Sequence, residues 1–157
     1  MRAKPIRQSK EQRVAYATRP PKSRTPRPVL FPQARYLTRK ERVALKAYQD
    51  YLLARLPDQI ERIVLFGSKA RGDSRRDSDV DLLVVLGGEK PKTAWGLDEP
   101  RWFTIVDCTF DFLMQYDVYI APTVMHSEEM RDEVPLIADI RKEGTELWRH
   151  RAIRKRN

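Results

Sequence analysis

The sequence has one cysteine and two histidines, and it contains no long apolar run. Cys108 cannot form an intramolecular disulfide, and with only His126 and His150 it cannot assemble a zinc site. No run approaches the roughly 18 apolar residues of a transmembrane helix, and residues 1–25 lack the apolar stretch of a secretory signal. These absences exclude a disulfide framework and a membrane-spanning protein, and we expect a cytoplasmic protein without membrane contact.

Acidic residues are scarce at both ends of the chain and concentrated in its middle. Residues 1–40 hold 12 Lys and Arg but one acid, whereas residues 41–148 hold 21 acids and 14 Lys and Arg. Residues 149–157 add five basic residues and no acid. The net charge of +9 therefore describes two basic ends around an acidic body. A basic nucleic-acid-binding domain is disfavoured, because the part of the chain able to fold is acidic.

Glycine is absent from residues 1–37, which hold six of the eleven prolines and show no sustained hydrophobic period. This composition predicts a disordered basic tail over residues 1–37. We expect one folded domain over residues 38–148 and a second basic tail over residues 149–157. The two tails are either solvated ends or an accessory, weak electrostatic contact to RNA.

The apolar residues of the predicted domain follow helical and strand spacings in turn. Short apolar runs predict strands at residues 63–66, 80–86 and 116–121. Helices are expected at residues 38–56, 102–113 and 127–144, with a surface loop over 89–100. Thr38 and Glu41 form a capping box at the start of the first helix. The strand at 80–86 is apolar on both faces and is therefore central. This order predicts an α/β fold with a small mixed sheet of roughly three to five strands flanked by helices.

A glycine-rich turn follows the first predicted strand and is suited to binding phosphate. Gly67 lets the backbone approach a ligand closely, and Ser68 offers a hydroxyl and a backbone N–H at the start of a helical turn. Lys69 and Arg71 supply positive charge nearby and are candidate nucleotide-binding residues, although they could simply offset local acids. A P-loop is excluded, because Asp73 and Ser74 follow Gly72 where that motif requires Lys and then Ser or Thr.

Two aspartates open the central strand. Asp79 and Asp81 are two residues apart, so their carboxylates project from one face, where a cation such as Mg²⁺ would offset their repulsion. Asp117 is the only acid of the strand predicted at 116–121. It is either a third metal ligand that accepts a proton from an attacking hydroxyl or a strand-edge acid that faces water. A phosphate turn, metal ligands and a base together predict nucleotidyl transfer.

The spacing of these residues resembles a known signature. Gly67-Ser68, ten residues, and then Asp79-x-Asp81 is similar to the motif of the polymerase-β-type nucleotidyltransferases, and the surrounding residues resemble the small minimal nucleotidyltransferases. The resemblance runs from about residue 38 to 148. It implies that Gly67 and Ser68 bind the nucleotide triphosphate, that Asp79 and Asp81 bind two metal ions, and that Asp117 is the third carboxylate. Lys69 stands where many relatives have Arg.

The expected reaction moves a nucleoside monophosphate, AMP from ATP in the favoured case, onto a hydroxyl. The resemblance implies that the acceptor lies on a partner protein or a second copy of the chain, for example a HEPN-type toxin that this protein adenylylates as an antitoxin. Two alternatives stay open at this stage. The chain could adenylylate a small molecule, or it could be a non-catalytic binding module, against which the presence of all three carboxylates argues.

Overall fold

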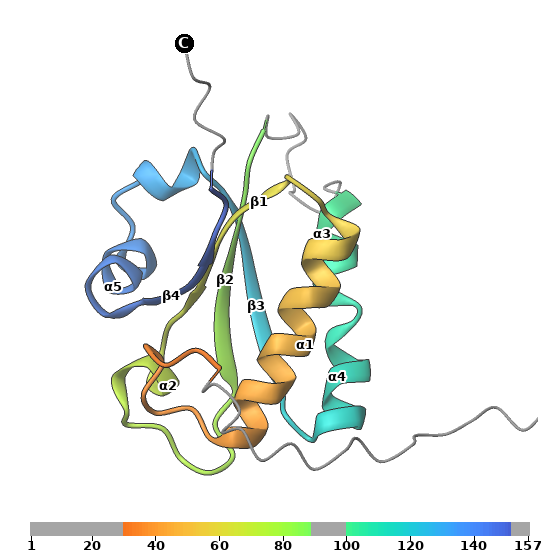
Figure 1. Cartoon of the computed structure of the whole chain (residues 1–157). Coiled ribbons are helices and arrows are strands. Elements are labelled where there is room, and N and C mark those ends of the chain that lie inside the picture. The colour runs from red at the N-terminus through yellow and green to blue at the C-terminus, as the bar shows by residue number, and fades with distance from the viewer. Residues whose placement is uncertain (1–29, 89–99, 152–157) are drawn as a thin grey trace, which may run out of the picture.

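A four-stranded mixed sheet forms the centre of the computed structural model, which describes residues 30–88 and 100–151 (Figure 1). The strands are β1 (Ile60–Leu65), β2 (Val80–Leu86), β3 (Ile120–His126) and β4 (Thr145–Arg149), in the order β3-β2-β1-β4. The helices are α1 (Arg39–Arg55), α2 (Ser68–Arg71), α3 (Pro100–Val106), α4 (Thr109–Tyr116) and α5 (Pro135–Glu143), with a 3-10 turn η1 (Glu129–Arg131). β1 is antiparallel to β2 and β4, whereas β2 and β3 are parallel. The predicted α/β fold with a mixed sheet is confirmed.

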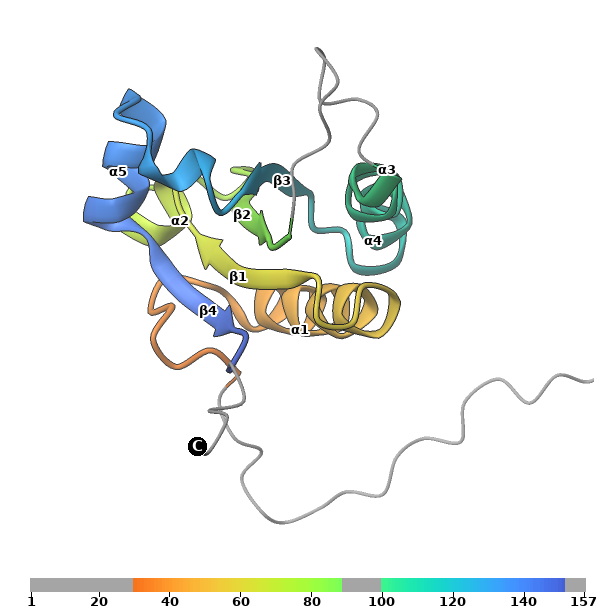
Figure 2. The same cartoon turned by 90° about the horizontal axis from the view of Figure 1, so that it is seen from above.

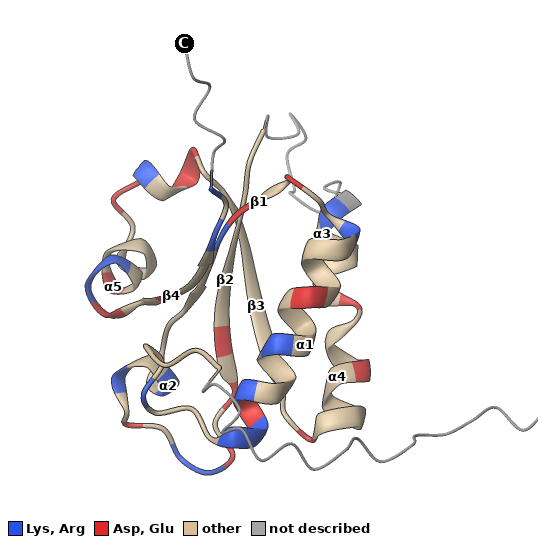
Figure 3. Cartoon of the chain, in the orientation of Figure 1, with Lys and Arg blue, Asp and Glu red and all other residues tan. Residues whose placement is uncertain are grey.

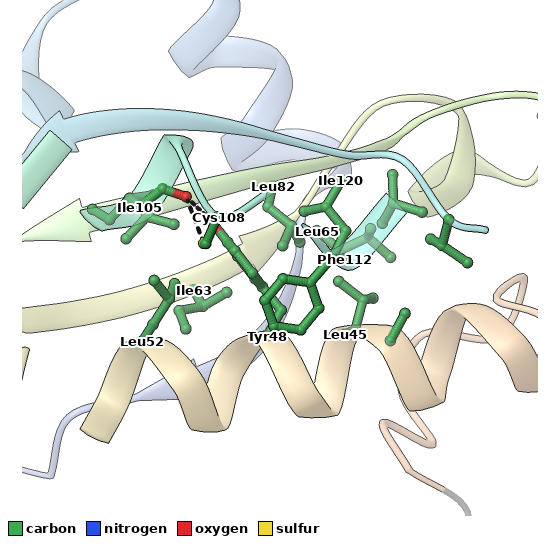
Figure 4. Close-up of a cluster of buried hydrophobic side chains, with 14 of the residues drawn as sticks. Leu45, Tyr48, Leu52, Ile63, Leu65, Leu82, Ile105, Cys108, Phe112 and Ile120 are labelled. Atoms are coloured by element: carbon green, nitrogen blue, oxygen red, sulfur yellow. Dashed lines mark hydrogen bonds between the residues drawn. The ribbon is translucent and has the colours of Figure 1, made fainter. Parts of the chain in front are cut away.

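Helices cover both faces of the sheet. Figure 2 shows α1, α3 and α4 on one face and α5 on the other. The side chains of β2 alternate between the two cores, because Leu82 and Val84 pack under α1 while Leu83 and Val85 pack with Ile140 of α5. The larger core is drawn in Figure 4. The prediction that residues 80–86 form a central strand is therefore confirmed.

The capping box at the start of α1 is present. The Thr38 hydroxyl accepts the Glu41 N–H (3.3 Å), and the Glu41 carboxylate accepts the Thr38 N–H (2.7 Å). The helix ends at Arg55 with Leu56 as its C-cap, as the sequence predicts. Tyr48 of α1 is buried in the core, and its hydroxyl group has a hydrogen-bond partner there, because the O–H donates to the carbonyl of Ile105 (2.7 Å).

The folded part of the chain begins before residue 38, so the predicted boundary of the basic tail is wrong. Residues 30–37 turn back against α1 and bury three apolar side chains, those of Phe31, Ala34 and Leu37. The Arg42 side chain holds this segment, because its guanidinium donates to the backbone carbonyls of Leu30, Phe31, Ala34, Arg35 and Leu37 at 2.5 to 3.5 Å. Composition predicted disorder because it does not reveal that one arginine satisfies these carbonyls.

Replacing Arg42 with alanine is expected to loosen residues 30–37. The carbonyls would lose a charged donor, and we expect the free energy of unfolding to fall by about 2 kcal/mol, the typical value for hydrogen bonds to a charged group. Chemical denaturation of the variant would measure this loss. Arg42→Lys is the control, and it should recover only part of the stability, because a single ammonium cannot reproduce the guanidinium fork. Full stability in Arg42→Ala would contradict the assignment.

The elements after β2 differ from prediction in several places. The helix expected at 102–113 is divided into α3 and α4, and the Thr109 hydroxyl donates to the Val106 carbonyl (2.8 Å) at the break. The third strand runs over Ile120–His126 rather than 116–121, because α4 continues to Tyr116, whose ring stacks on Phe112. Pro122 lies within this strand, and β3 tolerates it as an edge strand.

The C-terminal part of the domain also departs from prediction. The helix expected to begin at Ser127 begins at Pro135, with η1 before it, and it ends with Gly144 as its C-cap, as predicted. β4 was not predicted, and it includes Arg149, which was assigned to the basic tail. The loop predicted at 89–100 lies outside the described residues except for Pro100, which begins α3 instead. Most of the two tails also lies outside them, so weak RNA contact through the tails stays a prediction.

Cys108 is buried in the larger core. Burial raises the pKa of its thiol to about 11, so we expect slow reaction with thiol reagents in the folded protein.

Within residues 30–88 and 100–151, no helix is both long and apolar enough to cross a bilayer. Cytoplasmic location stays a prediction.

Candidate active site

The turn between β1 and α2 has a backbone that favours glycine at both ends. Gly67 has φ 68° and ψ −156°, a conformation that residues with a Cβ rarely adopt, and Gly72 ends α2 in the left-handed region at φ 91°. Between them, Ser68 begins the single turn of α2, in which the N–H groups of Ala70 and Arg71 both donate to the Gly67 carbonyl (3.1 Å). The Ser68 hydroxyl and N–H precede these groups at the start of the turn, where an anion can bind. The predicted glycine turn is therefore present, and its binding of phosphate stays a prediction.

Gly67 lies directly against the Asp81 carboxylate. A Cβ built on Gly67 would clash with Oδ2 of Asp81 and lie 3.1 Å from its Cγ. The backbone joins the same two segments, because the Phe66 N–H donates to the Asp81 carbonyl (3.0 Å). The structure therefore brings the predicted phosphate turn and one predicted metal ligand into contact.

Asp79 and Asp81 lie at the start of β2, on the end of the sheet where α1 and α2 also begin. Figure 3 shows acidic and basic residues gathered at this end. Asp79 is exposed, whereas Asp81 is half-buried. Burial raises the pKa of the Asp81 carboxyl, the charge of Asp79 raises it further, and Arg71 partly opposes the shift. Two adjoining carboxylates, one of them partly desolvated, are an oxygen donor pair that fits Mg²⁺.

Arg71 remains exposed beside the turn. Its guanidinium donates to Asp73 (3.0 Å) and to Glu143 at the end of α5 (3.4 Å). The hydrogen bond that Arg71 donates to Asp73 is the main cause that raises the pKa of the Arg71 guanidinium. Surface ion pairs of this kind are weak, so the guanidinium can exchange Asp73 for a phosphate oxygen. Its placement is compatible with the predicted role.

Lys69 points into the fold rather than toward a ligand. Its side chain is 4% exposed, and its ammonium lies 2.7 Å from Oε1 of Glu41 and 3.4 Å from the carbonyl of Arg75. The expectation that Lys69 contacts the nucleotide disagrees with this placement. The sequence did not reveal the pairing of Lys69 with Glu41, since the capping box explains one oxygen of Glu41 and leaves the partner of the other open.

Asp117 is not on a strand. It is the C-cap of α4 in the left-handed region (φ 50°), its side chain is 90% exposed, and it forms an ion pair with Lys40 of α1. The hydrogen bond and charge of Lys40 lower the pKa of the Asp117 carboxyl. The register of β2 and β3 places Ala121 beside Asp81, so the neighbouring strand position holds no acid. Its predicted place on a strand is wrong, because α4 extends over Tyr116.

In the part of the chain that the structure describes, no three His, Cys, Asp or Glu side chains are arranged to hold a metal ion. Over residues 30–88 and 100–151, Asp79 and Asp81 therefore form a pair without a third carboxylate. Tyr36, which the sequence placed in the tail, lies next to the turn, because a Cβ on Gly72 would lie 2.6 Å from its ring. No local pattern identifies such a residue, since its contact depends on the path of residues 30–37.

Comparison with known families agrees with this geometry. The family model described as "Nucleotidyltransferase domain" matches residues 45–139, more than half of the chain and the whole of the turn and the aspartate pair. The chain belongs to this nucleotidyltransferase family. It is therefore a nucleotidyltransferase enzyme, and the predicted class is confirmed.

This nucleotidyltransferase is similar to two proteins of Methanocaldococcus jannaschii that carry the name "Putative protein adenylyltransferase", MJ0141 and MJ0604. The first is 32% identical over 80 residues, which cover 51% of this chain and 74% of the relative. The second is 30% identical over 90 residues, with 57% and 77% covered. The match to a crystal structure of a toxin–antitoxin with AMP-PNP covers 67% of this chain and 73% of the matched chain, at 19% identity and a TM-score of 0.42.

Proposed function

We propose that this nucleotidyltransferase transfers AMP from ATP to a hydroxyl group on a partner protein and depends on Mg²⁺. The contact between Gly67 and the Asp81 carboxylate is the observation that carries the proposal, because it puts the turn suited to phosphate beside the carboxylates suited to a metal ion. Both relatives in Methanocaldococcus jannaschii are named as adenylyltransferases of protein, which supports a protein acceptor.

The reaction forms one bond and breaks one bond at the α-phosphorus. The acceptor oxygen attacks the α-phosphorus in line, the bond between this phosphorus and the pyrophosphate oxygen breaks, and pyrophosphate leaves. The proton of the acceptor hydroxyl passes to a base or to water. Bound Mg²⁺ would neutralise charge on the triphosphate and on the attacking oxygen. Asp79 and Asp81 would hold the ion together with phosphate oxygens of ATP, while Ser68 and the exposed Arg71 would orient the phosphates.

Purified full-length chain, Mg²⁺ and α-labelled ATP, with lysate of the source cells, would test this proposal. We expect label on a distinct protein band with the wild-type chain and none with Asp81→Asn. Label on a small molecule instead would overturn the protein acceptor and favour small-molecule adenylylation. No transfer with any NTP, with Mg²⁺ or Mn²⁺, would favour the non-catalytic binding module. A HEPN-type toxin as the partner, and two bound ions, stay predictions.

Asp117→Ala is expected to have little effect on transfer. The carboxylate is exposed and paired with Lys40, so we expect less than a tenfold loss of rate, below the roughly 10–100-fold typical of a residue that supports a metal ligand. Initial rates of labelled transfer would measure it, with Lys40→Met as the matched control. A loss as large as that of Asp81→Asn would contradict the prediction and restore Asp117 as the third carboxylate.

A further inference from the structure

We propose that Lys69 and Glu41 are positioning residues that hold the phosphate turn and the aspartate pair in register. This inference rests on the proposed function. Lys69 belongs to α2, Glu41 to the first turn of α1, and the carbonyl of Arg75 to the loop between α2 and β2. One buried ammonium therefore joins three segments that border the site.

The ion pair between Lys69 and Glu41 is buried, so it forms only when α1 and α2 are held in this relative position. The side chains of Lys69 and Glu41 are 4% and 9% exposed, and the second oxygen of Glu41 is already occupied by the Thr38 N–H. Burial raises the pKa of the Glu41 carboxyl, but the bonds from Lys69 and Thr38 outweigh burial and leave that pKa below its usual value. An ammonium in such a place needs both acceptors, since an unpaired buried charge is costly.

The loop held by Lys69 leads directly to the aspartates. Its turn is closed by Ser78, whose hydroxyl accepts the Arg75 N–H (2.8 Å) and whose N–H donates to the Arg75 carbonyl (3.2 Å). The same carbonyl accepts from Lys69, and Asp79 follows Ser78 in the chain. Holding Arg75 in place relative to α2 therefore holds the start of β2 in place. It also sets the position of the Asp79 and Asp81 carboxylates relative to Ser68.

A double variant can distinguish the positioning role of Lys69 and Glu41 from their contribution to stability. Replacing a buried ion pair with apolar side chains of similar size is often neutral for stability, whereas removing one partner is damaging. The double variant Lys69→Met/Glu41→Met should therefore regain most of the melting temperature lost in Lys69→Met. It cannot regain the bond to the Arg75 carbonyl, so the turn and the aspartates stay uncoupled.

Steady-state kinetics with ATP, melting temperature and amide hydrogen exchange would be measured for Lys69→Met, Lys69→Arg and the double variant. We expect kcat to fall at least about tenfold in Lys69→Met and in the double variant, with KM changed less, because a misplacement of about 1 Å can cost a hundredfold. The kcat of Lys69→Arg should be several-fold higher than that of Lys69→Met, since the guanidinium of arginine can reach both acceptors. Lys46→Met, which removes an exposed pair with Asp50 on α1, is the matched control and should behave as wild type.

Amide exchange keeps the inference testable apart from the proposed function. Residues 66–79 should exchange faster in Lys69→Met and in the double variant, while α5 should be unchanged. Wild-type kcat in the double variant, or unchanged exchange over residues 66–79, would overturn the positioning role. A wild-type chain that transfers no label would instead overturn the proposed function, and the exchange result would still decide the coupling.

Discussion

Asp81→Asn is expected to abolish transfer and, in the same protein, to raise the melting temperature without metal. Transfer should fall more than about a hundredfold, because even a residue that only supports a metal ligand is worth 10–100-fold. The metal-free fold should gain stability, since burial and then the charge of Asp79 raise the pKa of Asp81, so its carboxylate form is unfavourable when folded.

The raised pKa of Asp81 determines how the stability of the fold changes with pH. A carboxyl whose pKa is higher in the folded state binds protons more tightly when folded, so it stabilises the fold at low pH. That contribution is lost as the pH rises from the usual value of 3.8 through the raised value. Asparagine cannot ionise, so the gain in melting temperature should be present at neutral pH and vanish in acid.

Labelled transfer with Mg²⁺ and thermal melts in chelator at neutral and acid pH would check both parts. Asp77→Asn is the matched control, because Asp77 is an exposed acid in the loop before β2. It should leave both rate and melting temperature near wild type. An active Asp81→Asn variant would remove Asp81 from the site, and a neutral-pH melting temperature at or below that of wild type would contradict the electrostatic argument.

The parts of the site that lie close together in sequence could be predicted, because local patterns determine them. Gly67 and Ser68 end a strand and open a turn, and Asp79 and Asp81 open a strand that is apolar on both faces. Each of these conclusions needs only the residues within a few positions. The prediction of a central strand then followed from the absence of a polar face.

The parts that depend on distant contacts could not be predicted. Lys69 has the same charge whether it binds a phosphate or Glu41, which lies 28 positions earlier, and only the tertiary structure that brings Glu41 of α1 to Lys69 of α2 decides between them. The β-branched and aromatic residues around Asp117 predict a strand. The stacking of Tyr116 on Phe112 favours the helix there, and tertiary contacts outweigh strand propensity.

Gly67→Ala is expected to remove transfer for a reason different from that of Asp81→Asn. Alanine at φ 68° and ψ −156° adopts a conformation nearly confined to glycine, which costs about 1–3 kcal/mol. Its methyl group would also clash with the Asp81 carboxylate, so either the turn or the aspartate must move. We expect a loss of transfer above about a hundredfold, since a shift of about 1 Å suffices.

Gly88→Ala is the matched control for Gly67→Ala. Gly88 also has a positive φ of 78°, but a Cβ there would meet no atom within 4 Å. It should lower the melting temperature through backbone strain alone and leave the rate near wild type. If both variants lose stability and neither loses activity, the contact between Gly67 and Asp81 has no role in transfer.

A double-mutant cycle with Asp81→Ala isolates the clash itself. Removing the carboxylate removes the atoms that the new methyl group meets, so Gly67→Ala should destabilise the Asp81→Ala protein less than it destabilises wild type. The strain of the backbone is the same in both backgrounds and cancels in the comparison. Chemical denaturation of the four proteins would give the coupling, and additive losses would show that the turn and the aspartate are energetically independent.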